Sequence, residues 1–355
     1  MLYSTLTHIA TLDTISTIIS GDGTIYTSYG TYNTESQQAD LLSRSLVKAR
    51  NGNTLTGDTL FYDRDKGFGR AIGNIELRDS ANRAILTGDE GFYYELNDSA
   101  RVWGRALARQ YSANEEAEND TIYLHADTIR TFSVVTPAVY ENDSLVTAAD
   151  STHYLVAAPH VRFYRIDLQG ICDSMTMVQR DSMMYLHKHP VVWNENRQIF
   201  GNEIHVHMQD STADWARLPR FGFMAELVDE EFYNQLTGKE MYATFDGRSI
   251  RTLDVSGNVQ AIYLPMENDS TYNKIANMES SFLSAEFANQ QIERMKMWSE
   301  TNGTMTPLYL AKKNMYYLPR FRWFEPLRPK DPEDVFNISR EMLDLMAEPD
   351  FDSRP

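Results

Sequence analysis

Apolar and polar residues alternate through a segment that occurs twice in the first third of the chain. The two copies match at eight of 24 aligned positions and read TGDTLFYDRDKGFGRAIGNIELRD at Thr56–Asp79 and TGDEGFYYELNDSARVWGRALARQ at Thr87–Gln110. Each copy predicts strand, turn and strand, because aromatic pairs favour strands and the KG and ND pairs mark turns. Gly73 and Gly104 interrupt the returning strands, where a bulge or a close backbone approach is expected. A module of this size cannot bury its own apolar face, so the sequence predicts a stack of such modules.

The same alternation continues through most of the chain. Short segments rich in β-branched and aromatic residues, separated by Asp, Asn and Gly, predict further strands within 30–42, 120–132, 159–178, 181–193 and 201–210. A looser copy of the repeat occupies Thr237–Leu264, where Gly257-Asn258-Val259 echoes Gly73-Asn74-Ile75. The apolar residues of Met278–Trp298 fit no single helical stripe, so we interpret that segment as strands. The predicted fold class is therefore all-β.

The C-terminal segment has a different pattern. Its prolines at positions 319, 326, 329 and 332 interrupt regular pairing and predict an extended strap. After Asp331, a candidate cap, apolar residues recur every three or four positions, which predicts a helix at Pro332–Ala347. We divide the chain into a lead-in (1–23), a β array (24–318) whose two stacked halves meet near 150–158, and a strap with a short helix (319–355). Because the repeats supply their own pairing, we expect the array to fold without residues 320–355, with some loss of stability and with apolar surface exposed.

The composition restricts the class of partner. A formal net charge of −17 disfavours nucleic acid, because binding phosphates requires a basic surface. The one cysteine, Cys172, excludes an internal disulfide framework and a four-cysteine zinc site. The start, MLYSTLTHIATLDTISTIIS, lacks both the basic and the continuous apolar region of a signal peptide, and no run of 18 apolar residues predicts a membrane helix. Either the chain is cytosolic or an export signal precedes it.

Two His-x-His pairs are the strongest candidates for chemistry. His187 and His189, together with Glu195, nearly match the first motif of cupins, in which such residues hold a metal. The leading glycine of that motif is replaced and no second motif follows, so we favour ordinary strand histidines. His205 and His207 alternate with apolar residues, which places them on the opposite, solvated face of their strand. No nucleophile elbow or phosphate-binding loop occurs, so the sequence predicts neither an enzyme nor a cofactor.

The order of the motifs resembles the OstA/LptA family of lipopolysaccharide transport proteins. The resemblance rests on the GD pair, the aromatic pair and the GN[IV] segment of the repeats, and on DTIYLHADTIRTF, GTMTPLYL and the RFRWFEPLRPKDPEDVF tail. Together these look like the longer OstA-like proteins of Bacteroidetes, over residues 24–336. The resemblance implies a twisted OstA-like β-jellyroll of stacked antiparallel strands, whose V-shaped cross-section shelters acyl chains.

The same resemblance implies a function and partners. It implies a non-enzymatic protein of the periplasm, associated with the outer membrane, that binds lipopolysaccharide and bridges towards that membrane. Its implied partners are lipopolysaccharide, other lipopolysaccharide-transport proteins that pair with its edge strands, and further copies of the chain joined end to end. The acidic balance and the proline-rich tail differ from the small members of the family. The partner-binding surfaces of those members therefore do not carry over directly to this chain.

Equivalent positions of the two repeats supply the candidate lipid-binding residues. Stacking the copies aligns Phe61 with Phe92 and Ile72 with Trp103 in apolar ladders. We expect six residues to line or approach the lipid trough: Phe61, Ile72, Ile75, Leu77, Phe92 and Trp103. The lipid head group is anionic, as is the protein. Burial of the lipid tails, divalent cations or a local arginine cluster would have to offset the repulsion, and the candidate cluster is Arg78, Arg101, Arg105 and Arg109.

Two alternative functions remain open at this point. A cupin-like metal-binding β-barrel enzyme would hold a metal through His187, His189 and Glu195. A repetitive surface or glycan-binding β protein would instead present exposed aromatic platforms and show no preference for lipid.

Overall fold

The chain folds almost entirely into antiparallel β-strands, which confirms the predicted all-β class. A computed structural model describes residues 1–19, 23–50, 52–80, 83–95, 99–111, 121–141, 144–147, 149–209, 212–229, 231–267, 271–288 and 291–353. Strands take up 64% of the residues and helices 8%, in a jellyroll-like arrangement. Two compact units form: Met1–Ile166 with Val178–Arg180 and Asp331–Asn337, and Asp167–Met177 with Asp181–Lys330 and Ile338–Pro355.

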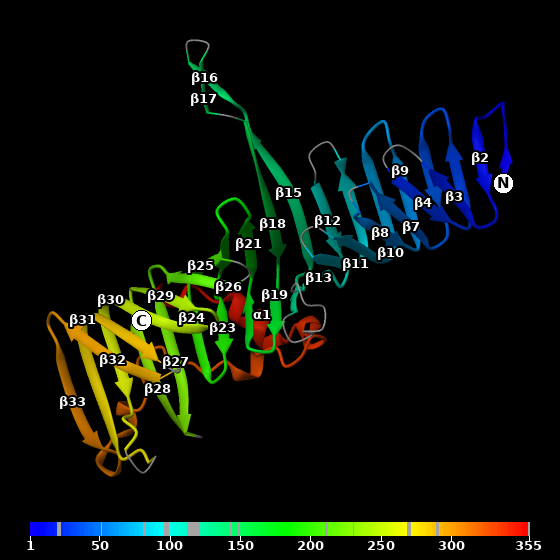
Figure 1. Cartoon of the computed structure of the whole chain (residues 1–355). Helices are drawn as coiled ribbons and strands as arrows, with labels where there is room; N and C mark the ends of the chain where they lie inside the picture. Colours follow the sequence, from blue (N-terminus) through cyan, green and yellow to red (C-terminus); the bar gives the residue numbers. More distant parts are fainter. Residues whose placement is uncertain are drawn as a thin grey trace. The chain divides into compact units, whose positions relative to one another are not determined.

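The first unit is a stack of short strands joined by turns (Figure 1). Its strands are β1 (Leu2–Tyr3), β2 (Ile9–Leu12), β3 (Ser16–Ile19), β4 (Gly23–Thr27), β5 (Gly30–Asn33), β6 (Gln38–Leu41), β7 (Ser45–Ala49), β8 (Thr54–Gly57), β9 (Thr59–Asp63), β10 (Phe68–Asp79), β11 (Ala84–Tyr94), β12 (Ser99–Trp103), β13 (Leu107–Gln110), β14 (Ile122–His125), β15 (Thr128–Thr136), β16 (Val139–Glu141), β17 (Ser144–Thr147), β18 (Asp150–Ala158) and β19 (Val161–Arg165). In Figure 1, the hairpin β16–β17 lies at the far end of the long pair β15–β18.

The long strands β10 and β11 connect two arms of this unit. The first half of β10 and the second half of β11 pair within the first arm. The order of strands in this arm is β2, β5, β6, β9, β10, β11, β12, β15, β18. Their other halves pair within the second arm, which runs β3, β4, β7, β8, β10, β11, β13, β14, β19. The register shifts between Ile72 and Ile75, so a bulge marks the corner between the arms.

The repeated GD and GN pairs build this corner. Gly73 has a φ of +76°, and its carbonyl accepts a hydrogen bond from the Asp58 amide at 2.9 Å. The side chain of Asn74 donates to Asp58 at 2.6 Å, and Arg44 donates to the other carboxylate oxygen at 2.8 Å. These two contacts, first Asn74 and then Arg44, hold the pKa of Asp58 below its usual value. In the second copy, Gly104 has a φ of +70° and accepts from the Asp89 amide at 2.8 Å.

Two apolar ladders line the space between the arms. The first-arm ladder is a row of directly paired, buried residues: Leu12, Gly30, Leu41, Leu60, Ala71, Gly91, Val102, Ile129 and Ala157. The second-arm ladder is the corresponding row Ile18, Ile25, Val47, Leu55, Leu77, Leu86, Ala108, Leu124 and Phe163. Residues of both ladders pack in one cluster, so the two arms face each other across an apolar interior.

The second unit repeats this plan, and its longest strands are β30 (Ser249–Tyr263) and β31 (Lys274–Ala288). Its other strands are β20 (Leu168–Cys172), β21 (Ser174–Val178), β22 (Met183–His187), β23 (Val191–Asn194), β24 (Arg197–Gly201), β25 (Glu203–Gln209), β26 (Thr212–Leu218), β27 (Gly222–Asp229), β28 (Phe232–Gly238), β29 (Glu240–Asp246), β32 (Gln291–Trp298) and β33 (Asn302–Pro307). The corner recurs at Gly257, whose φ is +77° and whose carbonyl accepts from the Lys239 amide at 2.9 Å. Strands β31 and β32 confirm the strand interpretation of Met278–Trp298.

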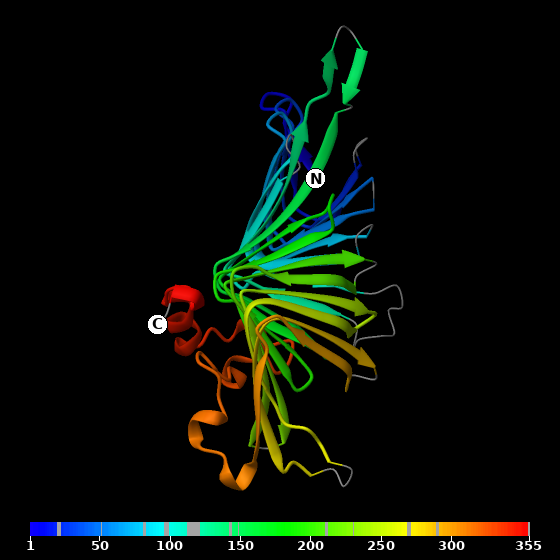
Figure 2. The same cartoon turned by 90° about the vertical axis from the view of Figure 1, so that its left-hand side faces the viewer.

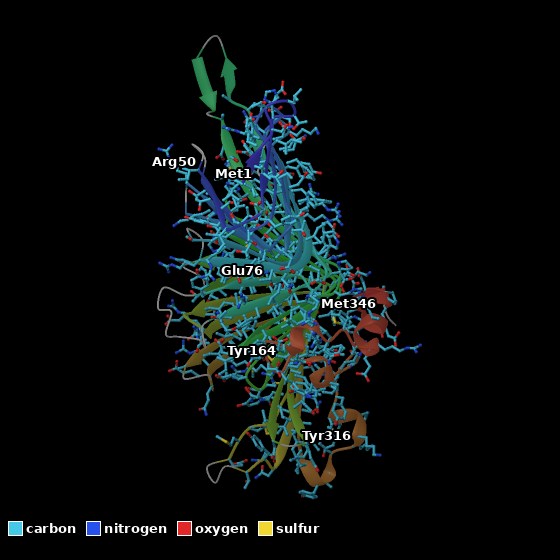
Figure 3. All side chains as sticks on the ribbon, turned by 90° about the vertical axis from the view of Figure 1, so that its right-hand side faces the viewer. Met1, Arg50, Glu76, Tyr164, Tyr316 and Met346 are labelled. Atoms are coloured by element: carbon cyan, nitrogen blue, oxygen red, sulfur yellow. The ribbon has the colours of Figure 1, made fainter. Side chains whose placement is uncertain are left out.

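The tail that follows β33 covers one sheet face of the second unit, except for Asp331–Asn337, which belongs to the first unit. It contains short 3-10 turns at Leu308–Leu310, Lys313–Met315, Glu325–Leu327, Asp334–Phe336 and Phe351–Ser353, and the helix α1 (Arg340–Ala347). Figure 2 shows this orange-to-red tail outside the strands, and Figure 3 labels Tyr316 and Met346 on it. Its apolar side chains join those of β20, β23, β24 and β27 in one buried cluster: Ile171, Val191, Trp193, Phe200, Phe221, Phe223, Ala225, Phe324, Leu327, Met342, Leu345, Met346 and Phe351.

A row of amide side chains fixes the tail along this face. Gln169, Gln198, Gln235 and Asn277 occupy every second strand of one ladder, alternating with apolar residues. Gln198 donates to the Arg322 carbonyl and accepts from the Phe324 amide at 2.8 Å. Gln235 makes the same two contacts with Tyr316 and Leu318, at 2.7 and 2.8 Å. Asn277 and Gln169 contact Met315 and Arg328, so the tail backbone follows the ladder strand by strand.

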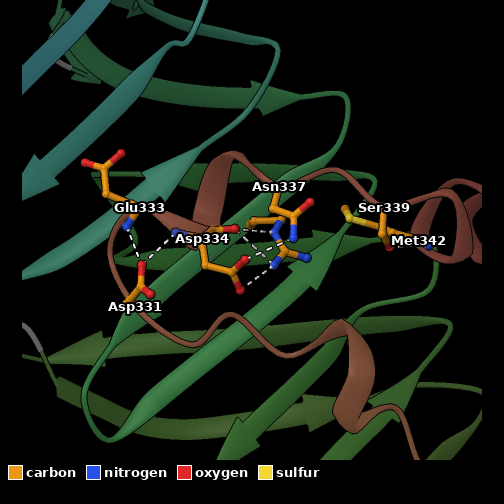
Figure 4. Close-up of polar contacts among 7 residues, drawn as sticks. Asp331, Glu333, Asp334, Asn337, Ser339 and Met342 are labelled. Carbon is orange, nitrogen blue, oxygen red and sulfur yellow. Dashed lines mark hydrogen bonds and ion pairs between the residues drawn. The ribbon is translucent and has the colours of Figure 1, made fainter.

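The helix is shorter than predicted. It begins at Arg340, where the Ser339 hydroxyl accepts from the Met342 amide at 3.2 Å, and not at Pro332. The Asp331 carboxylate accepts from the amides of 333 and 334, just before the 3-10 turn Asp334–Phe336, and does not cap the α-helix (Figure 4). The turn does not extend because buried Arg162 donates to the Asp334 carbonyl, the acceptor that the next helical turn would need. A tertiary contact therefore moved the start of the helix.

Candidate functional site

The interior between the two arms of the first unit is the candidate lipid trough. Ile75 is 3% exposed and belongs to the cluster that closes the corner. Leu77 lies on the second-arm ladder, directly between Leu55 and Leu86. Leu77 and several other members of that ladder, including Ile25, Val47 and Leu55, are only half-buried. The interior is therefore tightly packed at the corner and partly open to water along the second arm.

The other four candidate residues lie on the opposite side of the first arm. Side chains alternate along a strand, so Phe61 and Ile72 point away from the cluster that contains their neighbours Leu60 and Ala71. Phe92 and Trp103 share this outer face, where their rings are 5.1 Å apart. The structure thus separates the six residues into an interior pair, Ile75 and Leu77, and an outer group of four.

The repeat does align its equivalent residues, with one charged residue between them. Phe61 and Phe92 both lie directly opposite Arg70, one on each side. Ile72 and Trp103 flank Glu90 in the same way. Arg70 and Glu90 form an ion pair, so the aromatic and charged residues make a mixed patch on the outer face.

An open groove of about 640 Å³ lies on this outer face of the first unit. Aromatic and small side chains supply most of its surface, and Arg101 and Arg130 lie at it: its lining is Phe92, Tyr94, Ser99, Ala100, Arg101, Thr128, Arg130, Val156, Ala158 and Pro159. The guanidinium of Arg101 lies 5.6 Å from the Trp103 ring centre, and that of Arg130 lies 4.6 Å from the ring centre of Phe132. Of the candidate lipid-binding residues, Phe92 lines this groove.

The four arginines expected to act together are dispersed. Arg78 forms an ion pair with Glu76 at 3.1 Å. Arg105 pairs with Glu333 at 3.7 Å and lies 4.1 Å from the Phe336 ring centre. Arg109 is on β13 in the second arm, whereas Arg101 is in the first. The cationic pair that the structure does form, Arg101 with Arg130, required the pairing of β12 with β15, which no local repeat indicates.

The histidines of the cupin-like interpretation lie in different surroundings. Among the residues that the structure describes, no group of three or more His, Cys, Asp or Glu side chains is placed to hold a metal. His189 is 1% exposed and bonds to the Glu348 carbonyl of the tail at 2.8 Å. Burial lowers the pKa of His187. Glu195 occupies a turn with a φ of +54°. His189 therefore helps to attach the tail, and the three residues of the cupin-like interpretation are not brought together.

The second His-x-His pair lies on the face opposite its apolar neighbours, as its alternation predicts. Ile204 and Val206 are buried, at 3% and 9% exposure. His205 contacts Glu203 at 3.1 Å and His207 contacts Asp214 at 3.0 Å. These are ordinary partners of half-buried strand histidines.

The inner faces of the second unit are apolar and rich in methionine. One row of directly paired residues is Met184, Val206, Ala216, Ala243, Leu253, Ala285 and Met295. The sheet face opposite the tail carries the row Gly170, Val192, Ile199, Met224, Leu236, Ala261 and Met278. Methionine adapts its shape to irregular apolar partners. Several members, including Met224 and Met278, are half-buried.

Cys172 has the properties of a structural residue. Its side chain is fully buried, and burial raises the pKa of the thiol far above its usual value. The sulfur donates a hydrogen bond to the Ser174 carbonyl at 3.3 Å. A thiol in this state is a poor nucleophile.

Comparison of the chain with protein-family models and with curated proteins yields no match. Among the described residues, no helix is long and apolar enough to cross a membrane. The fold defines the class: an all-β, jellyroll-like protein of stacked antiparallel strands with a short α-helix near its C-terminus.

Proposed function

We propose that the protein is a non-enzymatic lipopolysaccharide-binding transport component that holds acyl chains between the arms of its units. The observation that carries this proposal is the second-arm ladder of the first unit, a continuous apolar row whose members Ile25, Val47, Leu55 and Leu77 stay half-buried. Burying one methylene group is worth about 0.8 kcal/mol, so an exposed chain of about 14 carbons would cost on the order of 10 kcal/mol. A carrier therefore needs a continuous apolar surface of this kind.

The ends of the strand array supply candidate surfaces for partners. Among the described strands, β3 pairs with β4 alone, and β33 pairs with β31 alone. Such edges offer unpaired backbone groups to a strand of another protein. We propose that other lipopolysaccharide-transport proteins, or further copies of this chain joined end to end, bind there, and that the protein acts in the periplasm at the outer membrane.

The test compares lipopolysaccharide binding by three variants with that of the intact chain. Leu77→Asp puts a carboxylate into the half-open interior, where water reaches it, so we expect a large loss of binding and a modest loss of stability. Ile75→Asp buries a charge in the closed corner and is expected to cost several kcal/mol of stability. Phe61→Asp lies on the outer face opposite Arg70 and is the control, with binding and folding retained.

Binding would be measured by titration with labelled lipopolysaccharide, and folding by thermal unfolding of the same samples. The proposal fails if the unaltered protein does not bind lipopolysaccharide, or if a folded Leu77→Asp variant binds it normally.

One observation favours a second function, glycan binding. A shallow groove of about 220 Å³ on the second unit is lined by Tyr242, Phe282 and Trp298, beside the carboxylates of Glu240 and Asp254. The rings of Phe282 and Trp298 stack at 5.4 Å, and both side chains are exposed. Aromatic faces with adjacent carboxylates suit sugar rings. Binding of delipidated polysaccharide as tightly as whole lipopolysaccharide would favour this alternative.

A further inference from the structure

Two arginines face each other in the outer groove of the first unit, and no described carboxylate forms an ion pair with either of them. Arg101 on β12 and Arg130 on β15 are directly opposite in paired antiparallel strands, and both are exposed. Their nearest neighbours in the same row are Phe92 on one side and Val156 on the other, and neither compensates the charge.

This arrangement is unfavourable unless a ligand compensates it. Like charges directly opposite each other in a sheet are destabilising. The chain has acidic residues in excess, with a net charge of −17, so an uncompensated cationic pair departs from its general composition. Aromatic rings lie against both guanidinium groups, at 5.6 Å for Arg101 and 4.6 Å for Arg130, which limits their positions. Two positioned guanidinium groups form a site suited to an oxyanion.

The surface around the pair indicates the rest of the ligand. The groove of about 640 Å³ falls in the size range of small-molecule sites, and its floor consists largely of aromatic and small apolar side chains such as Phe92, Tyr94, Val156 and Ala158. A free inorganic anion would leave this apolar surface exposed to water. We propose that the groove binds a phosphate-bearing amphiphile, whose phosphate bridges Arg101 and Arg130 and whose apolar part lies on these side chains.

This site is separate from the proposed trough. Its residues lie on the outer face of the first arm, whereas the trough residues Leu77 and Ile75 lie between the arms. The inference therefore does not rest on the proposed function, and the Leu77→Asp variant that tests the trough leaves this groove intact.

The experiment is calorimetric titration of the full chain with dodecyl phosphate below its micelle-forming concentration. Dodecyl maltoside, with the same tail and a neutral head group, and inorganic phosphate alone are the comparison probes. The unaltered protein is expected to bind dodecyl phosphate more tightly than either. The double variant R101Q/R130Q is expected to weaken that binding by about tenfold or more for each arginine removed, because charge-assisted hydrogen bonds contribute at least that much.

Two further variants test whether the binding depends on the position of the charges and not on the total charge. R50Q/R251Q removes the same charge from exposed arginines outside the groove, one of which, Arg50, is labelled in Figure 3, and is expected to bind as the unaltered protein does. Val156→Glu puts a carboxylate directly opposite Arg130 and is expected to raise the melting temperature and weaken binding.

Three results would overturn the proposal. The first is unchanged dodecyl phosphate binding in folded R101Q/R130Q. The second is an equal loss in R50Q/R251Q, which would indicate a general charge effect. The third is binding of inorganic phosphate, or of dodecyl maltoside, as tight as that of dodecyl phosphate, because then the anionic and apolar parts are not recognised together.

Discussion

Gly73 shows how a single residue of the repeat determines the corner between the arms. Its φ of +76° lies in a region that side chains with a Cβ rarely adopt. A Cβ at this position would lie 2.7 Å from a carboxylate oxygen of Asp58, the same residue whose amide bonds the Gly73 carbonyl. Gly104 and Gly257 have similar positive φ angles, +70° and +77°, which explains why a glycine recurs at this position in each copy.

We expect Gly73→Ala to lower the free energy of unfolding by about 1–3 kcal/mol, because it adds backbone strain and a clash at the corner. Gly69→Ala, four residues earlier on β10, is the matched control. A Cβ there would meet nothing closer than 3.8 Å, so the change is expected to be neutral or slightly stabilising. Urea unfolding of both variants measures the difference. Equal effects at the two positions would contradict this account of the corner.

For single residues, the sequence predicted the position of the bulge but not which face of the sheet each neighbouring side chain occupies. The glycine in each returning strand indicated an interruption, and the structure places it there. Ile72 and Ile75 are both apolar, but they are three residues apart on one strand and lie on opposite faces, Ile72 outside and Ile75 in the core. The sequence prediction assigned both to the trough because it followed their apolar character and not the alternation of faces.

The tail shows how an element without regular pairing becomes part of the core. Prolines indicated an extended strap, and the sequence led us to expect an array that folds without residues 320–355 but loses some stability and exposes apolar surface. The structure identifies that surface. Phe324, Leu327 and Phe351 of the tail are buried against Phe200 and its neighbours, so removing the tail would expose an apolar sheet face of the second unit. The amide ladder was not recognised because its members lie far apart in the sequence.

Gln198 tests the role of this ladder. Its side chain is fully buried and satisfies two tail backbone groups, the Arg322 carbonyl and the Phe324 amide. Gln198→Ala leaves both groups without a partner, and we expect it to cost about 2–4 kcal/mol of stability. Gln260→Ala is the control, because that side chain donates only to Glu279 in an exposed contact and should change stability by less than about 0.5 kcal/mol. Thermal unfolding with limited proteolysis of the tail provides the measurement, and a native-like Gln198→Ala would show that apolar packing alone holds the tail.

For the whole molecule, the sequence predicted the all-β class and the stacking of repeats because both follow from local alternation and a recurring corner. The outer groove was not predictable in the same way. Arg101 and Arg130 belong to strands separated by β13 and β14 in the sequence, and their opposition depends on which strand ends up beside which. This pairing joins strands that are distant in the sequence, so no local pattern indicates it.

The net charge of −17 leads to a prediction about salt that distinguishes the two proposed sites. Lipopolysaccharide held by its acyl chains in the trough is repelled by the protein as a whole, so raising the ionic strength from about 0.01 M to about 0.15 M, which shortens the screening length from about 30 Å to about 8 Å, should strengthen its binding. Dodecyl phosphate held by Arg101 and Arg130 gains from direct attraction, so the same change should weaken its binding. Titrations of both ligands across this salt range, with R101Q/R130Q as the reference for the second, measure the two slopes. If lipopolysaccharide binding also weakened steeply with salt, the anionic head group would dominate its recognition, and the trough could not be the main source of affinity.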